Sequence, residues 1–465
     1  MSRATTDRRA ALPSWTAPAL LALATVAAYL TSFDGVFQFD DWAVIVDEPR
    51  VHSLAAWWQS MPGIRPLLKL SYALNWQGGH GIAGFHAVNL GLHVANACLV
   101  LGLLRRLAAR LGMAGTLTPL VAALLFALHP VQTEAVTYIS GRSSSLAATF
   151  ALASLWCLEY GRTTTHPALR RLHTLFVSPL LFLLALGVKE TTMVVPAAIV
   201  LLVSCDARRR VPWREALAAA TPHALVLLLA ALLAATLPRY WMLLESSLTA
   251  RDLGVNLLSQ MHAVAWLVGQ LMMPWRLNAD PTLAVVEAWT PPTVALALLY
   301  ATLLILGCAS LRRRPALAFG ILWFFLWLAP TNSLLPRLDL ANDRQLYLAL
   351  AGPAWLAGLL AARAMALASR PRRIAVGAAL AGLLLCLAVS TAQRNAVYDS
   401  EIAFWADVAA KSPANARAAG NLGYALARAG RPVEAEALFR RALALDPQYT
   451  RAAINLMLLQ DGTLE

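Results

Sequence analysis

The sequence predicts an all-α fold, a polytopic transmembrane helical bundle followed by a short helical tail. The chain has 465 residues, of which 59% are hydrophobic and only 14% are charged. Soluble proteins carry about 25% charged residues, so this composition indicates a chain in largely apolar surroundings. Apolar runs recur up to residue 391 and then stop. We therefore expect a membrane domain over residues 1–395 and a separate tail over residues 400–461.

A bilayer span needs about 20 apolar residues, with roughly 17–25 tolerated. About eleven runs qualify, at residues 14–33, 85–104, 116–131, 143–160, 172–188, 191–206, 217–237, 293–310, 316–332, 346–362 and 374–391. Residues 256–273 are also apolar, but Gln260, His262 and Gln270 interrupt them, which favours an interfacial or re-entrant helix. Three arginines precede the first run, which we interpret as an uncleaved span rather than a signal peptide.

The basic residues favour one orientation of these spans. With eleven spans and a cytoplasmic N-terminus, the inner segments hold about twice as many basic residues as the outer loops, as the positive-inside rule requires. The net charge of +13 then reflects orientation, and no nucleic-acid partner is expected. The tail and most acidic residues fall on the outer side, where the first loop covers residues 34–84. The inner loops carry little except arginine. The five cysteines show no CxxC spacing, so a disulfide frame or zinc site is not expected.

The tail carries the pattern of one full tetratricopeptide repeat with half-repeats on either side. Pro413 and Pro447 are one 34-residue period apart, and Phe439 lies in the second helix of the repeat. Small residues at Gly423 and Ala435 would let the two helices approach closely. Such repeats need about three copies to be stable alone, so this tail is expected to lean on the membrane domain or on another copy. Peptide binding and a packing role are equally open.

The pair Asp40–Asp41 is the first candidate for catalysis. It follows the first span directly, and carboxylates beside a bilayer span are costly unless they have a function or a partner. Paired carboxylates can hold a metal, or one can act as a base while the other shapes its pKa. The alternative is a cap on a juxtamembrane helix.

Further candidates lie at span ends on the outer side. We expect substrate contacts from Arg65, His129, Glu134, Arg142, Lys189, Glu190, Arg344 and Tyr347. Arginine binds phosphate through its planar fork and lysine as a point charge. Structural alternatives stay open for several of them: His129 as a satisfied interface residue, a Glu134–Arg142 pair, a Lys189–Glu190 pair and a salt bridge from Arg344. His93 and Asn96 are better explained as hydrogen-bond partners between helices.

An ordered set of motifs resembles a known family. The motifs are Phe39-Asp40-Asp41-Trp42, Arg65-Pro66-Leu67 and the segments 86–93, 128–136, 189–190 and 342–347. Together with the repeat tail, they resemble the transmembrane and tetratricopeptide repeat-containing proteins, which are GT-C-type glycosyltransferases. The likeness runs through about residues 30–450. The chain departs from eukaryotic relatives in having fewer repeats, and its arginine-rich, lysine-poor composition looks bacterial.

The resemblance implies transfer of a sugar, typically mannose, from a polyprenyl-phosphate donor to a protein Ser/Thr hydroxyl outside the cytoplasm, with inversion. It implies an integral protein of a bacterial inner membrane, with a periplasmic tail that could bind the protein acceptor. One carboxylate of Asp40–Asp41 would be the base, and Arg344 or Lys189 would hold the phosphate. No cofactor beyond the lipid-linked sugar is expected, and a divalent metal is compatible but not required. Two alternatives remain: transfer to a lipid or cell-envelope glycan, and a non-enzymatic anchor that presents the tail.

Overall fold

The computed structural model describes residues 14–61, 63–113, 115, 117–333 and 335–464, and these residues form helices with no β-strand among them. The helices of the membrane domain are α1 (Thr16–Tyr29), α2 (Leu54–Gln59), α3 (Pro66–Gln77), α4 (Gly81–Arg110), α5 (Leu117–Leu128), α6 (Thr133–Val136), α7 (Arg142–Thr163), α8 (Pro167–Leu172), α9 (Ser178–Val188), α10 (Val195–Ser204), α11 (Trp213–Ala235), α12 (Pro238–Ala250), α13 (Leu253–Met272), α14 (Pro291–Ser310), α15 (Pro315–Leu328), α16 (Leu346–Ala349), α17 (Ala351–Leu367) and α18 (Arg370–Asn395). The tail contains α19 (Glu401–Lys411), α20 (Ala416–Arg428), α21 (Pro432–Leu445) and α22 (Thr450–Gln460). The predicted all-α fold class is confirmed. The arginines expected before the first span lie outside the described residues.

Six helical segments among the described residues are long and apolar enough to cross a membrane, and the number rises to eight if two bent helix pairs each count as one span. Two shorter apolar helices, Glu190–Ser204 and Pro315–Leu328, fall below that length. The chain is therefore a polytopic membrane protein, while the count of eleven spans stays a prediction. The predicted span 143–160 corresponds to α7, which is not among these candidates. Its polar residues are mostly buried against neighbouring helices, so this helix does not need an apolar surface. The helix α13, at the ambiguous run 256–273, is not among them either.

Proline explains the two bent pairs. The segments Leu117–Leu128 and Pro130–Val136 meet at 52°, and Asp343–Ala349 and Ala351–Leu367 meet at 55°. Pro130 and Pro353 each lack the backbone N–H that would continue the helical ladder, and each ring crowds the preceding turn. Both bends lie close to candidate site residues, because Glu134 and Arg344 belong to the short arms.

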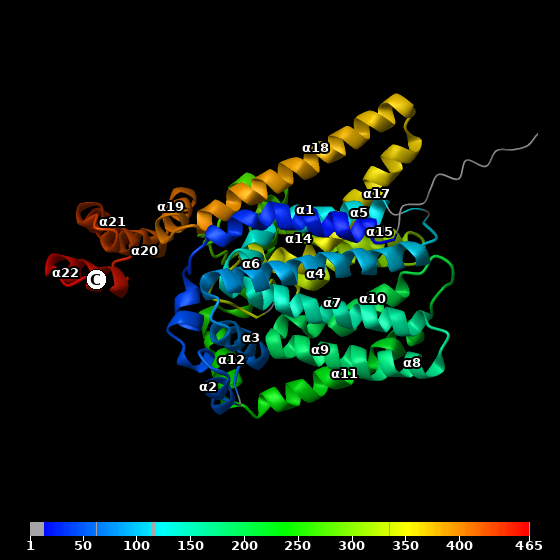
Figure 1. Cartoon of the computed structure of the whole chain (residues 1–465), viewed down its shortest axis with the longest axis horizontal. Helices are drawn as coiled ribbons and strands as arrows, with labels where there is room; N and C mark the ends of the chain where they lie inside the picture. The colour runs from blue at the N-terminus through cyan, green and yellow to red at the C-terminus, as the bar shows by residue number, and fades with distance from the viewer. Residues whose placement is uncertain (1–13, 62, 114, 116, 334, 465) are drawn as a thin grey trace, which may run out of the picture.

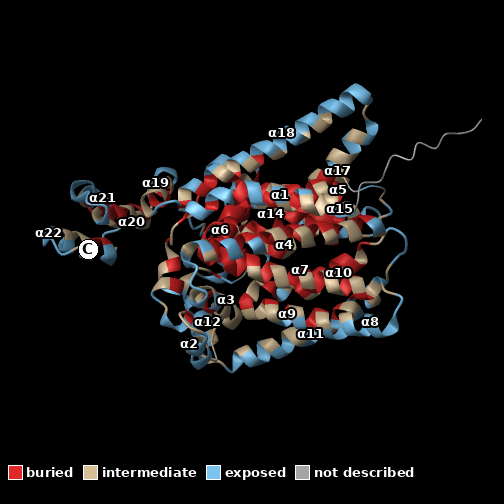
Figure 2. Ribbon diagram, viewed as in Figure 1, coloured by how far each residue is buried: buried red, intermediate tan, exposed pale blue. Residues whose placement is uncertain are grey.

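The bundle has two distinct ends (Figure 1). The helices α2, α3 and α12 lie at one end, and the tail helices α19–α22 project from that same end, at the left of the view. The loop that follows α10 and the first turn of α18, which both carry several arginines, lie at the other end. Figure 2 shows that α4, α5, α6 and α7 form the buried centre, whereas α11, α18 and the outer tail helices α21 and α22 expose most of their length. Which end faces the cytoplasm stays a prediction.

The arginine-rich end also carries acidic residues. Arg110 pairs with buried Glu159 at 3.0 Å, and Glu215 pairs with Arg162 at 3.3 Å and with Arg209 at 2.5 Å. Glu159 lies within the predicted span 143–160, so of these two acids only Glu215 belongs to a predicted inner loop, and the charged residues of those loops are still mostly arginine. The acids neutralise part of the positive charge, which lowers the cost of crowding arginines at helix ends.

The tail begins with helices that pack closely on each other. A Cβ atom at Gly423 would lie 2.9 Å from the Phe439 ring, closer than real Cβ contacts allow. Ala435 and Phe439 are fully buried beside it. The close approach of α20 and α21 has the geometry expected of a repeat hairpin, and the assignment to that repeat class stays a prediction.

Candidate functional site

The side chains of the adjacent Asp40 and Asp41 lie in different environments. Asp41 is fully buried, and its carboxylate accepts the backbone N–H of Gln38 at 2.9 Å and of Ser140 at 2.7 Å. The Asp40 side chain is 43% exposed, while its backbone N–H donates to the Tyr138 hydroxyl at 2.9 Å. Asp41 therefore ties the loop to the turn before α7, and Asp40 is the carboxylate that can reach a ligand.

Burial also separates the two carboxyl groups electrostatically. Burial raises the pKa of Asp41 to about 7, against the two backbone hydrogen bonds, which lower it. A group that titrates this close to neutrality is sensitive to pH in the folded protein. Asp41 lines neither the pocket onto which Asp40 opens nor the smaller pocket beside Tyr138.

Asp40 opens onto a pocket of about 290 Å³ that we call the polar pocket. Five cationic side chains and two carboxylates dominate its lining. The cations are Arg65, Lys69, Lys189, Arg337 and Arg344; the acids are Asp40 and Glu48; Ala43, Val44, Ile64, Leu68, Tyr72, Ser140 and Ser143 complete it. An excess of positive charge in a concave, partly buried site favours an anionic ligand.

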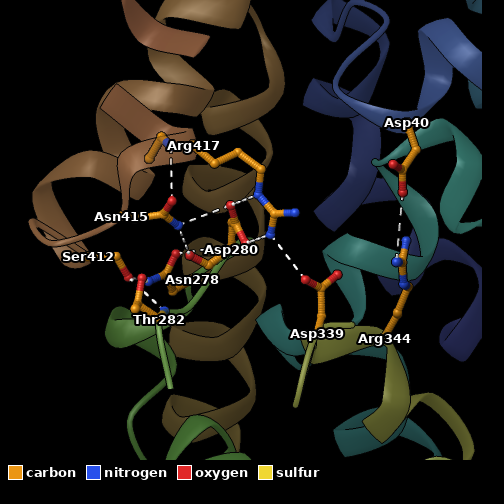
Figure 3. A network of polar contacts seen from close by, with 10 residues as sticks. Asp40, Asn278, Asp280, Thr282, Asp339, Arg344, Ser412, Asn415 and Arg417 are labelled. Carbon is orange, nitrogen blue, oxygen red and sulfur yellow. Dashed lines mark hydrogen bonds and ion pairs between the residues drawn. The ribbon is translucent and has the colours of Figure 1, made fainter. Parts of the chain in front are cut away.

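Glu134 holds Arg344 in place. Its carboxylate accepts the backbone N–H of Arg344 at 3.0 Å and lies 3.6 Å from the guanidinium Nε. The other end of the guanidinium approaches the Asp40 carboxylate at 3.9 Å, as Figure 3 shows. Glu134 does not line the polar pocket, so it acts on a ligand only through Arg344.

Lys189 lies at the back of the polar pocket. Its Nζ donates to the Ser144 hydroxyl at 2.8 Å, and no carboxylate pairs with it among the described ion pairs. Burial lowers the pKa of Lys189 well below its usual value, and the nearby cations Arg344 and Arg65 lower it further. A bound anion would reverse these effects, which makes the ammonium group a natural partner for a phosphate.

Arg65 and Arg337 complete the cationic lining. Arg65 sits in a left-handed backbone conformation, with φ +52°, and its guanidinium makes a forked contact to Glu190 at 2.9–3.2 Å. Burial lowers the pKa of Arg337 to about 10, and the charges of Arg344 and Arg65 add to this effect. Glu190 thus pairs with Arg65, and the alternative of a Lys189–Glu190 pair is not realised among the described ion pairs.

Five predicted substrate contacts do not line the polar pocket: Glu134 and Glu190, described above, and His129, Arg142 and Tyr347. His129 accepts the backbone N–H of Val131 and its Nε2 bonds the Leu271 carbonyl at 3.1 Å. Arg142 is fully buried and donates to Asn89 Oδ1 at 2.7 Å and to two backbone carbonyls. The alternative of a Glu134–Arg142 pair is not realised, and Arg142 has the partners of a residue that joins helices.

Tyr347 belongs to a buried network between helices. Its hydroxyl lies 2.8 Å from His93 Nδ1 and accepts a hydrogen bond from Asn96 Nδ2 at 3.0 Å. His93 Nε2 bonds the Ala127 carbonyl at 3.0 Å, so Tyr347 donates to Nδ1. His93 and Asn96, in the second predicted span, therefore act as hydrogen-bond partners between helices, as the sequence predicted.

Sequence reasoning missed two cations of the polar pocket, Lys69 and Arg337. A signal existed for Lys69, because the chain contains only three lysines and two of them line this pocket. Arg337 follows Pro336 in a loop with no regular pattern, and only the fold brings it beside Lys189 and Arg344. The described residues contain no group of three or more His, Cys, Asp or Glu side chains that could hold a metal ion.

Comparisons with known proteins give one consistent set of relatives. The chain is 32% identical over 179 residues to protein O-mannosyl-transferase TMTC4 of Mus musculus, which is 33% of this chain and 24% of that protein. It is 33% identical over 168 residues to the Homo sapiens TMTC4 protein, with 31% and 23% covered, and 34% identical over 196 residues to Homo sapiens TMTC1, with 38% and 22% covered. The matches thus span about a quarter of the length of these curated relatives. No family model and no solved structure matches the chain.

Proposed function

We propose that this chain is a membrane glycosyltransferase that moves a sugar, mannose as in the relatives' name, from a polyprenyl-phosphate donor to a Ser/Thr hydroxyl of a protein on the extracytoplasmic face. The single observation that carries the proposal is the polar pocket, in which an exposed carboxylate faces five cations. The similarity to protein O-mannosyl-transferases supports the same assignment. Membership of the GT-C class and a bacterial inner-membrane location are parts of this proposal.

The chemistry explains why the pocket needs this charge distribution. The donor is a phosphodiester with one negative charge, and cleavage of its sugar–oxygen bond leaves a phosphate monoester with up to two. Cations that hold this growing charge bind the transition state better than the substrate, which is the condition for catalysis. Arg344, Lys189 and Arg337 are the side chains we assign to the phosphate.

Asp40 takes the role of general base in this proposal. The acceptor hydroxyl loses its proton to the Asp40 carboxylate as its oxygen attacks the anomeric carbon from the face opposite the phosphate. The new carbon–oxygen bond forms while the bond to phosphate oxygen breaks, so the configuration inverts. Arg344 lies 3.9 Å from Asp40, which keeps base and phosphate site within the size of one sugar. These steps require no metal ion, although a divalent metal is compatible with them.

An apolar groove supports a lipid-linked donor rather than a soluble one. It has a volume of about 490 Å³ and is lined mainly by apolar residues of α10, α13, α14 and α15. A narrow pocket shares Lys189 and Arg344 with the polar pocket, and its other wall includes Trp327 and Thr331, the sequence neighbours of groove residues Leu328 and Asn332. Asn332, at the edge of the groove, donates to the Gln345 side chain at 3.1 Å. A polyprenyl chain lying in this groove would deliver its phosphate to the cations.

The test uses the full chain in lipid nanodiscs with synthetic polyprenyl-phosphate mannose and a panel of Ser/Thr-containing periplasmic proteins. We expect mannose on protein, detected by mass spectrometry, and almost none with Asp40→Asn. Asp47→Asn is the matched control, because Asp47 is an exposed carboxylate of the same loop outside the polar pocket. Mannose on lipid or glycan alone would move the proposal to the other acceptor class, and donor binding without any transfer would favour a non-enzymatic anchor.

A further inference from the structure

The beginning of the tail contacts the loop that carries Asp40 from both sides. The Phe39 ring meets the Trp405 ring edge-on, with centroids 5.3 Å apart. The Trp42 indole donates its Nε1–H to the Glu401 carboxylate at 2.8 Å. Phe39 and Trp42 flank Asp40–Asp41 in the sequence, so α19 fixes the residues on either side of the two aspartates.

Phe39 is also where this loop is conformationally unusual. Its φ is +41°, a left-handed conformation that costs free energy for a residue with a large side chain. Such a conformation persists only when its surroundings hold it. The holding contacts come from the tail, since Trp405 packs on the ring and the Arg417 guanidinium lies 5.3 Å above it.

Arg417 contacts the cationic wall of the polar pocket as well. Its guanidinium donates to Asp339 at 3.1 Å, and Asp339 lies in the loop between Arg337 and Arg344. It also makes a forked contact with buried Asp280, through Nε at 2.8 Å and a second nitrogen. Figure 3 shows Arg417 between Asp280 and Asp339, with Asp40 and Arg344 at the adjoining wall of the site.

A second set of hydrogen bonds fixes the tail against the same surface. Ser412 accepts the Asn278 side-chain N–H at 2.8 Å, Asn415 donates to Asp280, and Lys411 donates to the Leu277 carbonyl at 2.7 Å. These contacts involve α19 and the start of α20, whereas α21 and α22 lie farther out (Figure 1). The beginning of the tail, from α19 to the first turn of α20, therefore belongs structurally to the site.

We propose that the tail is a built-in positioning element and that Arg417 is a positioning residue, which sets the distance between the Asp40 carboxylate and the phosphate-binding arginines. It acts through Phe39 on the first and through Asp339 on the second. This inference rests on the proposed function for its kinetic part. It gives the beginning of the tail, α19 and the first turn of α20, a function that requires no bound peptide.

The experiment compares Arg417→Ala and Asp339→Asn with Arg440→Ala, in the full chain in nanodiscs. Arg440 is a matched control, because its partner Glu436 lies on the same exposed helix of the tail. Hydrogen–deuterium exchange is measured for peptides covering residues 36–46 and 335–346. We expect faster exchange in both segments for Arg417→Ala, faster exchange in the second for Asp339→Asn, and no change for Arg440→Ala.

The kinetic readout is kcat and donor KM for mannose transfer or donor hydrolysis. Because misplacement by about 1 Å can cost about 100-fold, we expect kcat to fall about 10- to 100-fold in Arg417→Ala, with a smaller change in donor KM. In the double variant, kcat should fall by less than the product of the two single-variant factors, since both changes break the same Arg417–Asp339 contact. Should Arg417→Ala fail to fold, Asp339→Asn decides, because Asp339 is partly exposed and its loss leaves Asp280 paired.

The outcomes separate this inference from the proposed function. Wild-type exchange in both segments and wild-type kcat in folded Arg417→Ala or Asp339→Asn would overturn the positioning role. Altered exchange in a chain whose wild type neither transfers nor hydrolyses the donor would keep the structural connection and reject the transferase.

Discussion

Replacing Asp40 and Asp41 separately by Asn should separate a loss of rate from a loss of stability. The sequence predicts that one of the two is the general base and that their roles differ. The structure exposes Asp40 to the polar pocket and buries Asp41 beneath two backbone N–H groups. The two variants keep the shape of each side chain and remove its ability to ionise.

The expected magnitudes follow from these contacts. A general base contributes about 10²–10⁴-fold to a rate, so Asp40→Asn should lower kcat at least about 100-fold. Its ion pair with Arg344 is long and partly exposed, and pairs of this kind contribute about 0–1 kcal/mol. The stability of Asp40→Asn should therefore stay within about 1 kcal/mol of the wild type.

Asp41→Asn should show the opposite pattern. Asparagine has one acceptor oxygen where the carboxyl group has two, so either Gln38 N–H or Ser140 N–H loses its partner. A buried donor left without an acceptor costs about 1–3 kcal/mol. At pH 6 the side chain at position 41 is largely uncharged in the wild type and uncharged in the variant. The difference in stability between the two proteins then measures the lost hydrogen-bond acceptor alone. The expected loss of kcat is smaller than for Asp40→Asn.

The assay combines donor turnover with thermal unfolding of the same nanodisc preparations, with Asp47→Asn as the control. Near-normal rates in both single variants and in the double variant would refute the catalytic role of the pair. A large rate loss in Asp41→Asn with a normal Asp40→Asn would reverse the assignment and show that the loop rearranges when the donor binds.

The remaining predictions concern the phosphate, pH and orientation. Arg344→Ala and Lys189→Ala should each raise donor KM about 10-fold or more without unfolding the chain, because each removes a cation from the polar pocket. Arg276→Ala is the control and should leave donor KM unchanged, because Arg276 is an exposed arginine outside that pocket. Unchanged turnover at limiting donor in both Arg344→Ala and Lys189→Ala would reject the phosphate assignment. The raised pKa of Asp41 favours its protonated form in the folded chain, so its contribution to stability is complete below about pH 4 and is lost as the pH rises through about 7. The difference between a pKa of about 7 in the folded chain and the ordinary 3.8 corresponds to at most about 4 kcal/mol of unfolding free energy. The wild type should therefore melt at a lower temperature at pH 8 than at pH 5. In Asp41→Asn, this part of the dependence of melting temperature on pH should be missing. A reporter that works only outside the cytoplasm, fused after Leu459, should be active, and activity of a cytoplasm-only reporter there would reject the eleven-span topology.

The sequence by itself determined the fold class, because hydropathy over windows of about 20 residues is a local property. It also predicted Asp40, Arg344 and Lys189 as site residues, since ionisable residues at span ends are conspicuous in an apolar chain, and the structure places all three in the lining of one pocket. It could not distinguish Asp40 from Asp41. Their surroundings are set by Ser140, about a hundred positions away, and by the unusual backbone at Phe39.

Only the tertiary structure decided which cations share a pocket. The sequence offers no way to rank basic residues such as Arg142, Lys189 and Arg337. In the structure, Arg142 donates to buried Asn89, while Lys189 and Arg337 line the polar pocket. The contact of Arg417 with Asp339 joins residues 78 positions apart, and no local pattern encodes it. The apolar runs determine which helices form, because whether a run enters the membrane depends on the hydropathy of that run alone. The placement of charges depends on how those helices pack, since a buried charge must find its partner wherever the fold brings one.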